Sequence, residues 1–267
     1  MMVQLGIIGG GVMAEAILSR ILAEKIYSPN QVRVSEPRSE RRQELVDRYG
    51  VQVTDNNREV AEATEMVLLA IKPQVFAQIA TELSGVKMPL LVSILAGVPI
   101  SKLEAAFPDR SIIRVMPNAP ATVGAGMSAI APNSHTTADR LAQAKTLLSA
   151  VGQVVEVPES LMDAVTGVSG SGPAFVALTI EALSDGGVAA GLPRAIATQL
   201  ALQTVLGTAQ MIQETGLHPG ELKDRVTSPG GTTIAGVRQL ELGGLRSALI
   251  EAVLAAYERS QELGRGN

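Results

Sequence analysis

Apolar and polar positions follow two different periodicities along this chain. Up to about residue 157, short apolar runs alternate with charged segments whose apolar positions recur about every 3.6 residues. The runs predict eight strands, at residues 3–8, 32–35, 51–53, 66–71, 90–94, 111–115, 127–131 and 153–157. Segments 38–49 and 74–83 are among the helices expected between them. This alternation is typical of βαβ units in a doubly wound α/β sheet.

The strand pattern stops at Pro158. The rest of the chain predicts helices at residues 161–168, 173–190, 193–215, 221–226, 232–242 and 245–263. Glycine or proline stands at most of the junctions between them, where helices commonly begin or end. We therefore expect an α/β domain over residues 1–157 and an all-α domain over residues 158–267.

Composition narrows the classes of partner. The chain has 267 residues, a net charge of −4, 2% aromatic residues and no Trp, whereas nucleic-acid binders concentrate Lys and Arg and stack bases on aromatic rings. No Cys is present, which excludes disulfides and thiolate metal sites and suits a reducing compartment. His135 and His218 lack the spacing of a zinc motif. We expect no nucleic-acid partner, no metal and a cytoplasmic location.

Hydropathy points to self-association rather than to a membrane. The apolar run LGIIGGGVM is too short to span a bilayer, and Glu181 and Asp185 divide the most apolar later region. The mean hydropathy of +0.24 is nevertheless high for a monomer in water. We therefore expect apolar helical surface to be buried between subunits.

A glycine-rich turn follows the first expected strand and opens a helix. It reads Gly9-x-Gly11-x-x-Ala14. In a dinucleotide-binding turn the first glycine permits the sharp bend, the second lets the backbone approach a diphosphate, and the small third residue permits close helix packing. The context of strand, turn and helix predicts a Rossmann-type domain, although a glycine turn that serves packing alone is the alternative.

The end of the second strand bears on the choice of cofactor. An acid there would bind the ribose 2′-hydroxyl of NAD, but the sequence reads VRVSEPRSERR, with Ser35 before Glu36. Ser35 can donate to a 2′-phosphate and Arg38 can pair with it, while Arg41 and Arg42 add positive potential. We expect NADP, with NADPH preferred. If Glu36 faces the ribose, NADH becomes competitive.

The first long helices of the helical half lack the proton donor that ketone reductases usually supply. Between Pro173 and Gln203 there is no Lys, His or Tyr to protonate an alkoxide. An iminium carbon accepts hydride without such a donor, so a cyclic imine fits better than a ketone. The run GVSGS, at 167–171, differs from a hydrolase nucleophile elbow because its fifth residue is Ser171 rather than glycine.

A polar break, TSPGGTTI at residues 227–234, separates two apolar helical stretches. Glycine and proline are costly inside a helix, so the break requires a reason. Its glycines lie just before a helix that begins at Thr232, where free N–H groups and the positive end of the dipole favour an anion. An ordinary helix-capping turn is the alternative.

Seven segments together resemble one enzyme family over essentially the whole chain. They read GGGVMA, AIKP, MPNAP, AVTGVSGSGPAF, LPRAIA, HPGELKDRVTSPGGTTIAG and GLRSALIEAV. In this order and spacing they are similar to pyrroline-5-carboxylate reductase, which reduces a ring imine to L-proline with NAD(P)H. The resemblance implies that the late loop holds the substrate and that the helical domain interlocks with a second copy in a dimer, with further assembly into a ring of dimers.

The resemblance also assigns roles to residues. It implies that Thr233 hydrogen-bonds the ring nitrogen and relays its proton as the catalytic residue. The expected substrate-binding residues are Glu159, Ser228, Gly230, Gly231, Thr232 and Thr233. The expected cofactor-binding residues are Ile8, Gly9, Gly10, Gly11, Val12, Met13, Ser35, Pro37, Arg38, Asn57, Ala70, Ile71, Lys72, Pro73, Ala96, Gly97 and Asn118.

Several of these positions have simpler interpretations. Glu159 could cap the helix after Pro158, and Lys72 could be an exposed lysine before a helix-starting proline. Asn118 could be a turn residue held by its own side chain. Two other functions also remain: a β-hydroxyacid dehydrogenase, which would need a lysine on the central helix, and a non-catalytic dinucleotide sensor.

Overall fold

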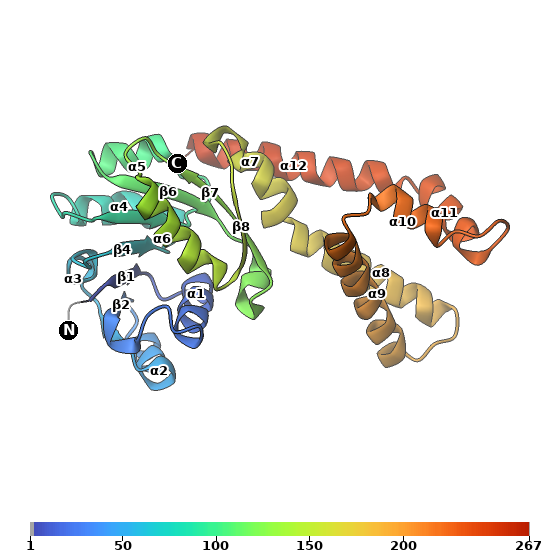
Figure 1. The fold of residues 1–267 in the computed structure, drawn as a ribbon, viewed down its shortest axis with the longest axis horizontal. Helices are drawn as coiled ribbons and strands as arrows, with labels where there is room; N and C mark the ends of the chain where they lie inside the picture. The colour runs from blue at the N-terminus through green and yellow to red at the C-terminus, as the bar shows by residue number, and fades with distance from the viewer. Residues whose placement is uncertain (1–2, 267) are drawn as a thin grey trace. The chain divides into compact units, whose positions relative to one another are not determined.

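The computed structural model describes residues 3–266 and contains one eight-stranded sheet (Figure 1). The strands are β1 Leu5–Ile8, β2 Val32–Ser35, β3 Gln52–Thr54, β4 Met66–Leu69, β5 Leu90–Ser93, β6 Ser111–Met116, β7 Gly126–Pro132 and β8 Gly152–Glu156. All eight strands predicted from the apolar runs are confirmed, with ends that differ by no more than two residues.

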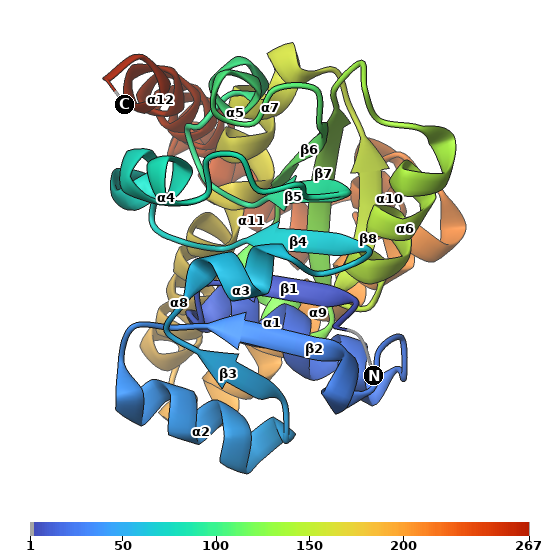
Figure 2. The ribbon, with the colours of Figure 1, turned by 90° about the vertical axis from the view of Figure 1, so that its left-hand side faces the viewer.

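The strand order places a topological switch at the first strand. The sheet runs β3-β2-β1-β4-β5-β6-β7-β8, so the chain proceeds outward from β1 in both directions (Figure 2). Neighbours from β3 to β6 pair in parallel, β7 runs antiparallel to β6, and β8 is parallel to β7. In such sheets ligands bind outside the carboxyl ends of the strands at the switch, here between β1 and β4.

Helices cover both faces of the sheet, as doubly wound folds require. The helices of this part are α1 Val12–Ala23, α2 Ser39–Tyr49, α3 Asn57–Ala61, α4 Phe76–Glu82, α5 Ile100–Ala106 and α6 Ala138–Ser149. Ile17 of α1, Leu45 of α2 and Leu147 of α6 belong to one buried cluster. Val60 of α3, Ile79 of α4 and Leu103 of α5 belong to another.

Successive strand residues divide between these two clusters. On β4, Met66 and Leu68 lie in the first cluster and Val67 and Leu69 in the second, and all four are fully buried. Because alternate side chains of a strand point to opposite faces, a run that is apolar throughout can be buried on both sides. The sheet therefore sits between two apolar layers.

Beyond β8 the described chain is helical, as the pattern predicted. The short segments η4 Glu159–Leu161, α7 Met162–Val165 and the π-helix η5 Thr166–Gly170 come first. They are followed by α8 Gly172–Ala189, α9 Arg194–Thr215, α10 Pro219–Arg225, α11 Thr232–Leu242 and α12 Leu245–Gly266. The chain forms two compact units, a sheet unit of residues 3–171 and 255–266 and a helical unit of residues 172–254.

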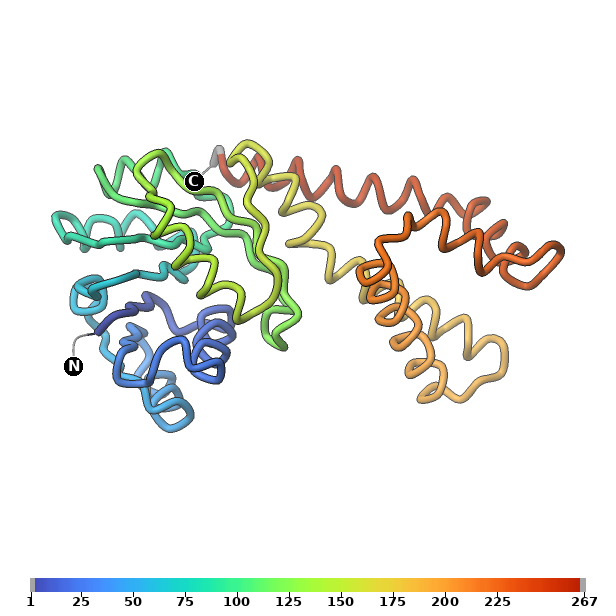
Figure 3. Tube along the Cα trace, in the orientation of Figure 1, coloured from blue at the N-terminus to red at the C-terminus, as the bar shows by residue number. Residues whose placement is uncertain are grey.

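The helical unit has very little interior of its own. Figure 3 traces its hairpin of α8 and α9, in which the Ser184 hydroxyl lies 2.8 Å from that of Thr198. Within residues 172–254 four residues are buried, namely Ser184, Ala197, Ala201 and Leu222. Large apolar side chains are instead exposed along α8 and α9, among them Leu178, Leu202 and Leu206. An exposed apolar surface of this kind indicates an interaction site.

One described helical stretch is long and apolar enough to cross a bilayer, judged by length and composition alone. It spans Glu159–Ala189 with a mean hydropathy of 1.2 in its most apolar window, 11% of which is buried. A single such stretch is weak evidence for a membrane span, because other apolar helices have the same length and composition.

Candidate active site

The turn after β1 has the geometry of a dinucleotide-binding turn. Gly9 has a φ of +99°, and a Cβ at this residue would lie 2.6 Å from the carbonyl oxygen of Ala70. Gly11 is the N-cap of α1, and no side chain caps the free N–H groups there. These groups and the positive end of the helix dipole fit the diphosphate of a dinucleotide.

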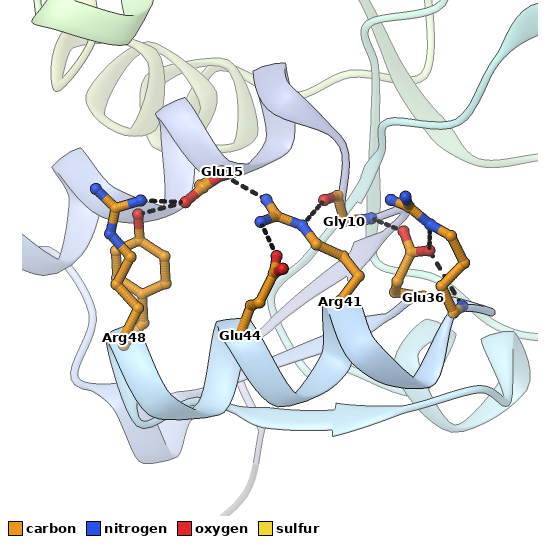
Figure 4. A network of polar contacts seen from close by, with 8 residues as sticks. Gly10, Glu15, Glu36, Arg41, Glu44 and Arg48 are labelled. Atoms are coloured by element: carbon orange, nitrogen blue, oxygen red, sulfur yellow. Dashed lines mark hydrogen bonds and ion pairs between the residues drawn. The ribbon is translucent and has the colours of Figure 1, made fainter.

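Gly10, in the middle of this turn, is held from both sides by residues beyond β2 (Figure 4). Its N–H donates to Oε2 of Glu36 at 3.2 Å, and its carbonyl accepts from Nε of Arg41 at 3.0 Å. Gly9 N–H donates to the carbonyl of Ser35 at 2.9 Å. The turn is thus fixed before any ligand arrives, which lowers the entropy that binding must remove.

Glu36 is buried beneath the turn rather than exposed to a ligand. The residue is 5% exposed, and its Oε1 accepts from the backbone N–H of Arg38 at 3.2 Å and from its Nε at 2.9 Å. Burial raises the pKa of Glu36, but the hydrogen bonds and charge of Arg38, together with Gly10 N–H, outweigh it and hold the pKa below its usual value. The carboxylate is therefore ionised and fully engaged.

Ser35, the last residue of β2, and Asn57, the first residue of α3, form a chain of hydrogen bonds. The Ser35 hydroxyl donates to Oδ1 of Asn57 at 2.7 Å, and Nδ2 of Asn57 donates to Glu82 at 2.9 Å. Ser35 is 2% exposed. Its proton is therefore directed to Asn57, which leaves Arg38, with 67% of its side chain exposed, as the accessible donor beside Pro37.

Arg41 and Arg42 differ from the expectation that they add free positive potential. Arg41 pairs with Glu15 and with Glu44, while Nη1 of Arg42 donates to the carbonyls of Glu36 at 2.7 Å and Pro37 at 2.9 Å. The charge of Arg41 is balanced by these two acids, and the guanidinium of Arg42 binds backbone carbonyl groups. Sequence reasoning missed this role because it depends on where α2 packs. The acidic residue Glu15, in the first turn of α1, was the feature of the sequence that could have indicated this pairing.

The later cofactor positions lie at the same edge of the sheet. Ile8 ends β1, and the segment Ala70, Ile71, Lys72 and Pro73 follows β4. Lys72 is exposed and precedes the 3-10 segment η2 Pro73–Val75, and it makes no ion pair within residues 3–266. Ala96 and Gly97 follow β5 in the same manner. Since carboxyl ends of parallel strands meet at one edge, the topology brings these loops together around Gly9.

Two further positions beside the turn differ in exposure. Val12 is 74% exposed and Met13 is half-buried, and both lie in the first turn of α1. Asn118, just after β6, uses both ends of its side chain: Oδ1 accepts from Met127 N–H at 2.9 Å, and Nδ2 donates to the Ser169 hydroxyl at 3.3 Å. Asn118 thus connects the end of β6 to the π-helix η5.

The late loop belongs to the helical unit and forms an open helix start. Gly230 has a φ of +69°, and Gly231 is the N-cap of α11 without a capping side chain. A Cβ at Gly231 would lie 2.3 Å from the Ser228 hydroxyl oxygen. The hydroxyls of Ser228, Thr232 and Thr233 make no hydrogen bond within residues 3–266, and Thr233 is half-buried. Hydroxyls and N–H groups are therefore available here for an anionic ligand.

Glu159 is engaged inside the sheet unit. Its Oε1 accepts from the N–H of Ile100, the first residue of α5, at 2.6 Å, and pairs with Nη1 of Arg114 at 3.1 Å. Arg114 is 8% exposed on β6, so the carboxylate compensates a buried charge. The contacts of Glu159 are those of a helix-capping and charge-balancing residue.

Both histidines make hydrogen bonds that hold local structure, His218 through its ring and His135 through its backbone carbonyl. Nδ1 of His218 accepts from Gly220 N–H at 3.1 Å at the start of α10, and the carbonyl of His135 accepts from Ser111 at 2.7 Å. Within the described residues 3–266, no group of three His, Cys, Asp or Glu residues is arranged to hold a metal ion.

Comparison with known proteins finds matches to two family models and to several relatives. Residues 159–263 match a model described as pyrroline-5-carboxylate reductase dimerisation, and residues 4–97 match one described as NADP oxidoreductase, coenzyme F420-dependent. A pyrroline-5-carboxylate reductase from Synechocystis is 64% identical over 99% of this chain and 100% of its own length. A solved reductase of the same name from Coxiella burnetii has 35% identity and a TM-score of 0.91, covering 98% of this chain and 99% of its own.

A second solved structure bears on the cofactor. The pyrroline carboxylate reductase of Plasmodium falciparum, with NADP bound, is 31% identical with a TM-score of 0.86 and covers 98% of each chain. The dimerisation model spans the whole of the helical unit, residues 172–254. The exposed apolar surfaces of α8 and α9 lie within the residues that match this dimerisation model.

Proposed function

The chain belongs to the pyrroline-5-carboxylate reductase family, and we propose that its late loop, Ser228 to Thr233, binds the substrate of that family's reaction. The enzyme reduces the C=N bond of 1-pyrroline-5-carboxylate to give L-proline, the last step of proline biosynthesis, as an NADP-dependent oxidoreductase that forms a dimer. The observation that carries this function is the 64% identity over 99% of the chain.

We propose that the sheet unit holds the cofactor at the switch between β1 and β4. The uncapped start of α1 binds the diphosphate, and Arg38 binds the 2′-phosphate. Lys72 and the loop of Ala96 and Gly97 lie at the same edge and complete this site. NADPH bound there supplies the hydride for the imine carbon.

The start of α11 supplies the groups that bind the substrate's carboxylate and ring nitrogen. The N–H groups that follow Gly231 hydrogen-bond the substrate carboxylate, and the Thr233 hydroxyl hydrogen-bonds the ring nitrogen and relays its proton. Between Pro173 and Gln203 there is no Lys, His or Tyr, which fits an imine that needs no alkoxide protonation. Catalysis then rests on orientation and on placement of charge.

We propose a cytoplasmic enzyme whose dimers associate into a ring, with no membrane contact. The dimerisation model across residues 159–263 supports a contact with protein, rather than with a membrane, for the apolar stretch Glu159–Ala189.

Initial-rate measurements test the function directly. The protein is incubated with 1-pyrroline-5-carboxylate and either NADPH or NADH, and in parallel with NADP and a panel of 3-hydroxy acids. Turnover of the imine alone is expected. Turnover of the hydroxy acids would indicate a β-hydroxyacid dehydrogenase, and binding of cofactor without turnover of either substrate would indicate a dinucleotide sensor.

Replacement of Thr233 by valine tests the role of its hydroxyl. Thr233→Val keeps the shape of the side chain but removes the proton-handling group, so kcat is expected to fall about 10- to 100-fold. Thr232→Val is the neighbouring control, with a smaller effect on kcat. An unchanged kcat in Thr233→Val would reduce this residue to a part of the helix start.

A further inference from the structure

Three N–H donors converge on the two carboxylate oxygens of Glu36, which Figure 4 shows from close by. Oε2 accepts from Gly10 N–H, and Oε1 accepts from the backbone N–H and the Nε of Arg38. The side chain is 7% exposed, so water has little access to its carboxylate oxygens. This arrangement connects the diphosphate turn to the exposed arginine beyond β2.

The chemistry of the three partners requires a carboxylate. Each partner is a donor, and an ionised carboxylate accepts on both oxygens. A glutamine of the same shape would present its NH₂ group either to Gly10 or to Arg38, placing donor against donor in a buried position. One hydrogen bond would be lost if the NH₂ group faced Gly10 and two if it faced Arg38, and a bond that Arg38 kept to the neutral amide oxygen would lose its charge assistance.

The carboxylate also determines which edge of Arg38 is free. Because Nε is bonded to Glu36, the two Nη groups at the end of the guanidinium remain available, and 67% of the side chain is exposed. A guanidinium binds a phosphate best through two parallel N–H groups. An acid at this point of the sheet would otherwise accept the ribose hydroxyls of NAD.

We propose that Glu36 is a positioning residue for NADP recognition: it turns under Gly10 and holds Arg38 with its Nη edge toward the 2′-phosphate. Glu36 stands where an acid would bind the ribose of NAD, but it contributes to NADP selection through Arg38. This inference rests on the proposed cofactor site at the switch between β1 and β4 and deepens it by naming how that site selects the phosphorylated ribose.

Calorimetry with two nucleotide fragments tests the proposal without any imine turnover. Adenosine 2′,5′-bisphosphate carries the 2′-phosphate and AMP lacks it, so the ratio of their affinities isolates that group. In Glu36→Gln the ratio is expected to fall about 10-fold, as for loss of a charge-assisted contact, with AMP affinity changed less than about twofold. In initial rates, KM for NADPH rises while kcat stays near that of the wild type.

A double-mutant cycle with Arg38→Ala shows whether Glu36 acts through Arg38. Arg38→Ala alone is expected to lower the affinity ratio about 5- to 150-fold and to spare NADH. Glu36→Gln added to Arg38→Ala is then expected to lower it no further. Glu40→Gln, an exposed acid on the first turn of α2, is the matched control for loss of one charge and should leave the ratio unchanged.

Three results would overturn the proposal. The first is a Glu36→Gln variant that binds the bisphosphate as well as or better than the wild type, which would make Glu36 a repelling charge. The second is an equal loss for AMP and the bisphosphate, which would leave a structural role alone. The third is a further loss in the Arg38→Ala background. Failure of imine reduction, with these affinities as expected, would instead contradict the proposed function only.

Discussion

The space around each glycine's missing Cβ shows whether packing requires the glycine or whether the space is left open for a ligand. A Cβ on Gly6, within β1, would lie 2.2 Å from the carbonyl oxygen of Val60. A Cβ on Gly11 would meet nothing within 4 Å, and its backbone is extended with a φ of −73°. The dinucleotide motif predicted Gly11 from local spacing, but nothing local signals the approach of α3 to Gly6.

Alanine at these two glycines should therefore separate stability from cofactor binding. Gly6→Ala should lower the free energy of unfolding by about 1–3 kcal/mol, because the opposing atom belongs to the backbone and cannot rotate away. Gly11→Ala should leave that free energy nearly unchanged and raise KM for NADPH, because the methyl group occupies the approach to the diphosphate. Urea unfolding and initial rates measure the two effects. Equal unfolding midpoints for both variants would contradict the assignment.

Two helices on one face of the sheet are joined through a single acid. Glu15 of α1 pairs with Arg41 and Arg48 of α2 and accepts from the Tyr49 hydroxyl at 2.8 Å. Burial raises the pKa of Glu15, but the hydrogen bonds of Arg41 and Tyr49 and the charges of both arginines outweigh it and lower the pKa below 4.5. The charge patterns of α1 and α2 indicate exposed faces when each is taken alone, and the pairing emerges only when they pack.

The lowered pKa of Glu15 has a defined consequence for acid stability. A carboxyl whose folded pKa is depressed contributes stability that is present above its unfolded value, near 4.5, and is lost as pH falls through the folded pKa. Glu15→Gln should therefore be less stable than the wild type at pH 7, and the difference should shrink below about pH 4.5. Urea unfolding from pH 7 to pH 3 measures it. A difference that is constant over this range would show that Glu15 contributes through shape alone.

At the scale of the whole molecule, the two units differ in how they are stabilised. The sheet unit has two buried apolar clusters, whereas residues 172–254 bury four residues and expose leucines along α8 and α9. A helical unit with so small an interior gains stability when another chain covers its apolar surface. The high mean hydropathy indicated a buried surface between subunits, and residues 159–263 match a family model described as a dimerisation domain.

Charges placed on this surface should dissociate the dimer. Leu202 and Leu206 are 53% and 57% exposed and lie four residues apart on one face of α9. The double variant Leu202→Glu/Leu206→Glu should sediment as a monomer and lose imine reduction, while its sheet unit still binds adenosine 2′,5′-bisphosphate. Val155→Glu on β8, 37% exposed in the sheet unit, is the control and should remain dimeric. A fully dimeric and active double variant would place the interface elsewhere.

The amino-acid sequence by itself determined the eight strands, the helical second half and the glycine turn, because periodicity and backbone preference act over a few neighbouring residues. The same local signals located the helix start at Thr232, which the structure places at the first residue of α11. The proposed roles of the site residues stay predictions.

The tertiary structure decided the rest. The antiparallel direction of β7 against β6 and the turning of Glu36 beneath Gly10 appear in no local pattern. Both depend on which segments, distant in sequence, meet in the folded chain. The direction of a strand follows from where its neighbour lies, and the orientation of a buried carboxylate follows from which N–H donors surround it.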